Sequence, residues 1–223
     1  MWRNKINGQN VVRIFHGFSL VEILVSLSLA TFLFFVIAKS YTSMIYNQQK
    51  QQELLNLQQH SHQLLNYFQQ HIQHIGYQGK DREKSNYNAF LLNGKSYYLA
   101  SPNCFIFFYD VEGDGKIGEK QRTKKYDMDI FGFNFQNNRF LKLNNKNIKN
   151  CRDTLCSEWI NSCKQSNQWE NILDRVDYQV KDLKFRWVVE DKIISVDIIL
   201  NSIKYPEITY QATAYSYILN TGE

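Results

Sequence analysis

The sequence predicts an α+β protein in which one long N-terminal helix is followed by a mainly antiparallel, β-rich head. Residues 18–75 contain neither glycine nor proline, so no strong helix breaker interrupts them. Beyond Gly79, short runs of aromatic and β-branched residues alternate with polar ones, which is typical of strands. The 223 residues are enough for one modest globular core in addition to an apolar segment.

Residues 18–38 form an apolar run with a single charge, Glu22. As a helix, this run is long enough to cross the roughly 30 Å hydrocarbon core of a bilayer. The basic residues Arg3, Lys5 and Arg13 precede Gly17 and no acid does, which predicts a cytoplasmic N-terminus. A secretory signal would have a shorter apolar core followed by its cleavage site. We therefore expect this helix to remain in the membrane.

Glu22 is the unusual residue of the apolar run. An ionisable group inside a membrane helix costs about 2.5–3.5 kcal/mol and usually has a partner and a function. One interpretation is that Glu22 lies close enough to the interface to stay hydrated. The other is that it pairs with the α-amino group that cleavage between Gly17 and Phe18 would create, in its own helix or in a neighbouring one.

The segment from Gly17 to Glu22, Gly-Phe-Ser-Leu-Val-Glu, resembles the class III signal of type IV prepilins and type II secretion pseudopilins. In that family a prepilin peptidase cuts after the glycine and methylates the new N-terminus. The resemblance implies a leader peptide over 1–17, with Gly17 as the cleavage residue, Phe18 as the methylated terminus and Glu22 as an assembly acid. It also implies the type IV pilin fold, with residues 18–38 as the transmembrane and filament-core helix.

Residues 39–79 are expected to continue this helix into the head. Beyond the membrane run, apolar residues recur at steps of three and four, with Ser61 filling one gap, and trace one face of the helix: Leu54, Leu57, Leu64, Phe68, Ile72 and Ile75. Gly76 then stands where a left-handed helix cap is expected. Major pilins usually carry a kinking proline where this chain has Lys39, which leaves the bending of the helix open.

Two further features belong to the end of this helix. The sequence Ile-Gly-Tyr-Gln-Gly over residues 75–79 resembles the W-type minor pilins and the related prepilin-peptidase-dependent protein B. His71 and His74 have the spacing to share a metal, but no carboxylate or cysteine stands beside them at helical spacing. We therefore expect a solvent-facing histidine pair.

Residues 80–223 are predicted to form the β-rich periplasmic head. Residues 104–109 are apolar on both faces and predict a central strand. Residues 131–135 and 140–143 flank Asn137-Asn138 and predict a hairpin. Residues 183–189 and 194–200 alternate as two half-buried strands, and a change of apolar phase between Ala214 and Tyr215 predicts a β-bulge in the last strand.

All four cysteines, Cys104, Cys151, Cys156 and Cys163, lie beyond the membrane run. An even number in a segment that faces an oxidising compartment predicts two disulfides, with three pairings open. A zinc site and free buried thiols are the alternatives, although zinc sites usually show tight pairs such as C-x2-C. Residues 144–168 are expected to form a disulfide-braced loop.

The segment that follows residues 104–109 could hold calcium. Asp110, Glu112 and Asp114 supply oxygen at alternate positions, Gly115 follows, and the Lys116 carbonyl comes next, as in the first half of an EF-hand loop. The second half departs from that pattern, because Glu119 comes two residues early. A glycine-rich acidic turn is the alternative interpretation.

The net charge and the motifs of the sequence limit the classes of function that fit it. The formal net charge is +5 and falls to +2 without the leader (5 − 3), so the charge does not support DNA as a partner. Apart from His16 the histidines lie on the long helix, and no G-x-S-x-G, P-loop or H-E-x-x-H motif occurs. We therefore expect a protein that is not an enzyme.

The resemblance implies a minor pilin of a type IV pilus, with competence or DNA-uptake pili among the candidates. It would cross the inner membrane once, present its head to the periplasm, and move to the pilus tip to initiate or cap assembly. The implied partners are the prepilin peptidase, other minor pilins and the major pilin. A minor pseudopilin of type II secretion and a membrane-anchored module that binds calcium or another ligand are the alternatives.

Overall fold

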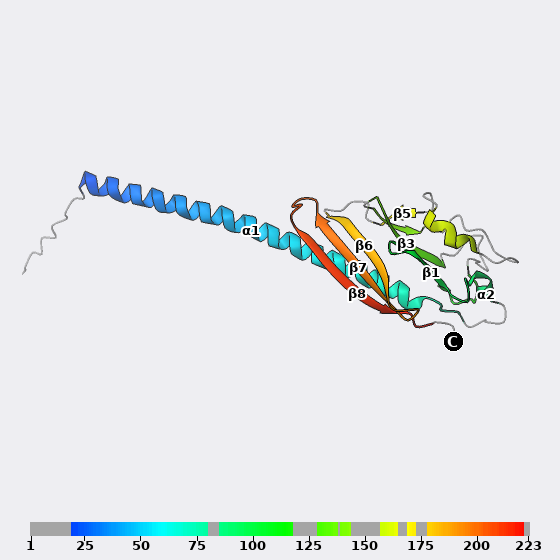
Figure 1. The fold of residues 1–223 in the computed structure, drawn as a ribbon. Coiled ribbons are helices and arrows are strands. Elements are labelled where there is room, and N and C mark those ends of the chain that lie inside the picture. The colour runs from blue at the N-terminus through cyan, green and yellow to red at the C-terminus, as the bar shows by residue number, and fades with distance from the viewer. Residues whose placement is uncertain are drawn as a thin grey trace, which may run out of the picture. The chain divides into compact units, whose positions relative to one another are not determined.

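The structure is a computed structural model that describes residues 19–79, 85–117, 129–137, 139–143, 157–164, 169–172 and 178–220. The chain divides into two compact units, one ending at Gln49 and one beginning at Lys50. The helix α1 (Leu20–His74) starts in the first unit and ends in the second, as the change from blue to cyan in Figure 1 shows. The predicted uninterrupted helix is confirmed.

Between Leu20 and Ala38, the first unit presents apolar side chains on all sides of α1. This part of the helix is long and apolar enough to cross a membrane, and its most apolar window is entirely unburied in the structure. Phe34, for example, is 76% exposed. A helix that is apolar around its whole circumference is stable only where lipid or other apolar helices surround it.

The second unit buries one face of α1 under its sheets. The buried residues of the helix are spaced by three and four: Leu57, Ser61, Leu64, Leu65, Phe68 and Ile72. Phe68 lies at the centre and meets Phe133, Phe140 and Phe185 with its ring edge-to-face. The predicted stripe is confirmed from Leu57 onward, whereas Leu54 is 41% exposed.

A five-stranded antiparallel sheet forms the first half of the head, in the order β1-β2-β3-β4-β5. Its strands are β1 (Tyr97–Ser101), β2 (Cys104–Phe108), β3 (Ile130–Gln136), β4 (Arg139–Leu143) and β5 (Trp169–Asn171). Every residue of β2 is buried between β1 and β3, which confirms the predicted central strand. The β3–β4 hairpin is also confirmed, and Asn137 takes a positive φ of 52° at its turn.

A three-stranded antiparallel sheet forms the other half, in the order β6-β7-β8. Its strands are β6 (Tyr178–Val189), β7 (Ile193–Ser202) and β8 (Thr209–Tyr217). The predicted bulge in β8 is wrong, because β8 pairs with β7 from Thr209 to Tyr217 without a shift in register. The aromatic residues Tyr215 and Tyr217 are exposed and Ser216 is buried, so the apolar phase changes while the backbone stays regular.

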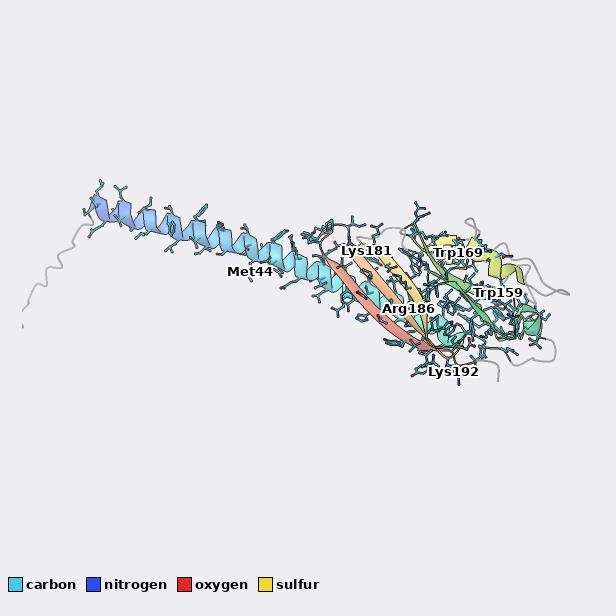
Figure 2. All side chains as sticks on the ribbon, in the orientation of Figure 1. Met44, Trp159, Trp169, Lys181, Arg186 and Lys192 are labelled. Atoms are coloured by element: carbon cyan, nitrogen blue, oxygen red, sulfur yellow. A yellow bond between two sulfur atoms is a disulfide. The ribbon has the colours of Figure 1, made fainter. Side chains whose placement is uncertain are left out.

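The two sheets share one core with α1, and a second core lies on the other side of β2. The second core includes Ile106 and Phe108 of β2 together with Trp159. Trp159 belongs to the 3₁₀ helix η3 (Ser157–Lys164), and its indole N–H donates to the carbonyl of Phe90 in the short helix α2 (Tyr87–Phe90) at 3.1 Å. Figure 2 shows Trp159 and Trp169 on this side of the head.

Candidate functional site

The first turn of α1 contains Glu22, the single charged residue of the apolar run 18–38. The carboxylate of Glu22 accepts a hydrogen bond from the backbone N–H of Ser19 at 2.9 Å. An acid three residues after a serine at a helix start can satisfy a backbone N–H that lacks a helical partner. The negative charge also lies at the positive end of the helix dipole. Glu22 therefore caps the helix, a role that the Ser-x-x-Glu spacing of residues 19–22 could have predicted.

Gly17 and Phe18 lie outside the described residues. The structure therefore does not test the expected cleavage and methylation. It does place the acid at the first turn of a membrane-length helix, bonded to the backbone N–H of Ser19. A carboxylate there can neutralise a positive charge next to the helix start.

The end of α1 has two glycines that allow close packing. Gly76 has a φ of +78°, and a Cβ on it would come within 2.2 Å of the carbonyl oxygen of Asn220. A Cβ on Gly79 would come within 2.2 Å of the carbonyl oxygen of Gly113. The expected helix cap at Gly76 is confirmed, and the structure shows in addition that both glycines let the chain touch distant backbone.

Asp110 joins this segment to the loop that follows β2. Its side chain is buried, and each of its oxygens accepts two backbone N–H groups. Oδ1 accepts from Gly113 at 2.7 Å and from Asp114 at 3.3 Å. Oδ2 accepts from Gly115 at 2.6 Å and from Gly79 at 2.9 Å. The carboxylate therefore fixes the loop and attaches it to the chain leaving α1.

The predicted calcium donors are described only in part, because Glu119 lies outside the described residues. Asp114 uses Oδ1 to accept the N–H of Lys116 at 2.9 Å. Within the described part of the chain, no three His, Cys, Asp or Glu side chains converge into a metal-binding group. Calcium binding stays a prediction, and the observed role of Asp110 is to accept backbone N–H groups.

The two histidines near the end of α1 differ in environment. His74 is exposed, whereas His71 is half-buried and its Nδ1 lies 2.8 Å from the hydroxyl of Tyr109. Burial, with the charge of His74 as a smaller cause, lowers the pKa of His71 to about 4. Burial also raises the pKa of Tyr109 above its usual range. The expectation of a solvent-facing pair is therefore wrong for His71, which packs between Tyr67 and Phe131.

Of the three pairings open to the cysteines, the structure has a disulfide between Cys104 and Cys163. It joins the first residue of β2 to η3 and so fastens the second core to the five-stranded sheet. Cys151 and Cys156 lie outside the described residues, as does most of the predicted loop 144–168. Their pairing stays a prediction.

Comparison with known proteins matches these features to one family. The family model of prepilin peptidase-dependent protein B matches residues 50–218, almost the whole second unit. An uncharacterized protein of Haemophilus influenzae is 26% identical over 137 residues, which are 54% of this chain and 58% of the relative. The chain thus spans less than two thirds of that relative's length. No solved structure matches significantly. An apolar helix that Glu22 caps, continued into an α+β head that the family model covers, makes this chain a member of the prepilin peptidase-dependent protein B family, a group of pilin-like proteins.

Proposed function

We propose that this protein is a minor pilin that a prepilin peptidase processes between Gly17 and Phe18 and that helps to start or cap a type IV pilus at its tip. The observation that carries the proposal is the Glu22 carboxylate at the first turn of an unburied, membrane-length helix. The helix needs apolar surroundings on every side, and a membrane and a filament core both supply them.

Cleavage would give Phe18 a charged α-amino group one residue from the N–H that Glu22 accepts. A carboxylate in apolar surroundings is costly unless a positive charge compensates it. The processed amino group, in the same subunit or in a neighbour, would compensate it and would itself be neutralised. The unprocessed chain lacks this charge at Phe18, so assembly would require processing.

Mass spectrometry of the purified protein tests processing directly. We expect an N-methylated Phe18 as the first residue, and Gly17→Asp should leave the leader attached. A wild-type chain that keeps its leader in cells with an active prepilin peptidase would contradict the proposal.

Two substitutions at Glu22 separate its charge from its capping bond. Glutamine at this position still accepts the Ser19 N–H, because capping boxes use Glu and Gln alike. If assembly needs the charge, Glu22→Gln and Glu22→Ala should both be cleaved normally and both reduce pilus number, counted by electron microscopy. Normal piliation in Glu22→Gln would show that capping alone suffices and would remove the proposed ion pair.

A further inference from the structure

The last strand of the head, β8, forms one edge of its sheet, and most of its outward backbone groups make no hydrogen bond to a described residue. Gln69 Nε2 donates to the carbonyl of Tyr215 at 2.9 Å, which shows that the backbone of the odd-numbered residues points away from β7. No other hydrogen bond to the outward backbone groups of Thr209, Gln211, Thr213 or Tyr217 is found in the described part of the chain.

The sequence of this edge lacks the usual protection against pairing. Natural edge strands are short, charged, interrupted by proline or bent by a bulge, because unpaired backbone groups accept strands from other chains. β8 is Thr-Tyr-Gln-Ala-Thr-Ala-Tyr-Ser-Tyr, nine residues without charge or proline, and its register with β7 has no shift. We propose that β8 pairs with a strand from the head of another pilin-like protein, in a parallel orientation. This inference rests on the proposed function.

The direction of α1 determines which occupant fits. Three contacts place α1 alongside β8 in the same direction: Lys50 with Glu207, Gln69 with Tyr215, and Ile75 with Asn220. Proteins anchored in one membrane by such helices have those helices parallel. A second copy that paired its own β8 in the antiparallel sense would reverse its helix relative to the membrane.

A second copy is also unsuited to parallel stacking of its sheet. The strand parallel to β8 at the opposite edge of the same sheet is β6. Its edge already contacts the first sheet, where the N–H of Phe185 donates to the carbonyl of Pro102 at 2.6 Å. The β6 edge of a second copy is thus already engaged, and the proposed occupant is a strand of a different pilin-like head. A second copy that offers its own β8 in the parallel sense is the alternative that the test distinguishes.

An open cleft of about 680 Å³ continues the edge beyond β8. Its lining includes Gln73, one helical turn after Gln69, and Leu219, two residues after β8 ends. Tyr77 and Val111 add apolar surface to it. A strand running parallel to β8 would bring its following residues to this cleft, whose lining combines apolar surface with the polar side chains of His74, Asp110 and Asn220. Backbone pairing would supply affinity and the cleft would supply specificity.

The test uses the full chain in cells that assemble pili. The photoreactive residue p-benzoylphenylalanine replaces Tyr217, which is exposed beside the edge, and in a control it replaces Val188 of β6. We expect an adduct from position 217 and none from 188, with the cross-linked peptide mapping by mass spectrometry to a head strand of another pilin-like protein. An adduct at twice the mass of the processed chain would assign a second copy and overturn the inference. An absent adduct, or one in a protein that is not pilin-like, would also overturn it.

Backbone pairing is then separated from side-chain contact at Gln211. Gln211→Pro removes an outward N–H and leaves the β7 ladder intact, whereas Gln211→Ala keeps the backbone. The adduct yield should fall about tenfold in the proline variant and stay unchanged in the alanine variant. Equal yields would overturn the inference. If Gln211→Pro does not fold, Gln211→Lys, which places a charge on the edge, decides by the same criterion. The N-terminus is sequenced in the same samples, so a methylated Phe18 without an adduct overturns only this inference, and an uncleaved leader overturns the proposed function.

Discussion

The two parts of α1 have the same backbone and opposite surfaces. Residues 20–49 and 50–74 form one helix without a break. The first part exposes apolar side chains on all sides as far as Ala38, whereas the second buries one stripe of them. The absence of glycine and proline determines the helix, and the distribution of apolar residues determines what surrounds it. The first part needs lipid or other subunits as its apolar surroundings, whereas the second receives them from its own chain.

The largest effect should come from removing the ring at the centre of the packed part. Phe68 is fully buried, so Phe68→Ala should lower the free energy of unfolding of the head by about 3–5 kcal/mol. Phe34→Ala is the matched control in the first part, and because Phe34 contacts no core of its own chain, the head should be unaffected. Denaturant unfolding of both variants in detergent measures this difference. A comparable loss in Phe34→Ala would contradict the division of the helix into two surfaces.

A second prediction concerns the attachment of the chain that leaves the packed part. Asp110→Ala would leave four backbone N–H groups without their acceptor, and we expect a loss of roughly 2–3 kcal/mol in the stability of the head. Asp114→Ala removes the acceptor of one backbone N–H, that of Lys116, and should lower the stability of the head by less. Adding calcium tests the predicted ion site in the same samples: a denaturation midpoint that rises with calcium in the wild type but not in Asp110→Ala supports the site. An unchanged wild-type midpoint would mean that the Asp110 carboxylate accepts backbone N–H groups and binds no calcium.

Much of the fold could be predicted because periodicity reports burial directly. The helix, the central strand β2, the β3–β4 hairpin and the alternation in β6 and β7 all follow from it. The prediction of a bulge in β8 was wrong because the periodicity argument assumes that aromatic residues face the core. Tyrosine tolerates exposure, and Tyr215 and Tyr217 lie on the open face. The division into two sheets depends on contacts between distant segments, such as Phe185 with Pro102, which no local pattern reports.

The importance of Glu22 could be predicted from the sequence, whereas the contacts of His71 and Asp110 could not. Glu22 stands out because a charge in an apolar run is rare, and the Ser-x-x-Glu spacing is enough to predict its capping bond. The environment of His71 could not be predicted, because it is formed by Tyr109, which follows β2, and by Phe131 of β3, both distant in the sequence. Asp110 was recognised as an oxygen donor, but that spacing equally suits a carboxylate that binds backbone N–H groups.

His71 gives a third prediction, on pH. The unfolded chain binds a proton at this residue near pH 6.5 and the folded chain only near 4, so the unfolded state holds more protons between these values. Stability should therefore fall as pH drops from 6.5 toward 4, by on the order of 1–2 kcal/mol once screening at this partly exposed residue is allowed for. Thermal unfolding across this range should be less pH-dependent in His71→Phe than in the wild type. The exposed His62→Gln serves as the control, and equal slopes in all three proteins would contradict the assignment to His71.

The smallest expected effect locates the point where the two surfaces of α1 meet. Leu54 and Leu57 fall on the same predicted stripe, yet Leu54 is 41% exposed and Leu57 only 1%. Leu54→Ala should change the unfolding free energy of the head by less than about 1 kcal/mol, because most of its side chain stays in water. Leu57→Ala, which removes fully buried methyl groups, should cost about 2–5 kcal/mol. Unequal losses in denaturant unfolding would place the start of intramolecular packing between the two residues. Equal losses would show that the stripe is already covered at Leu54, and the boundary would then move toward the membrane.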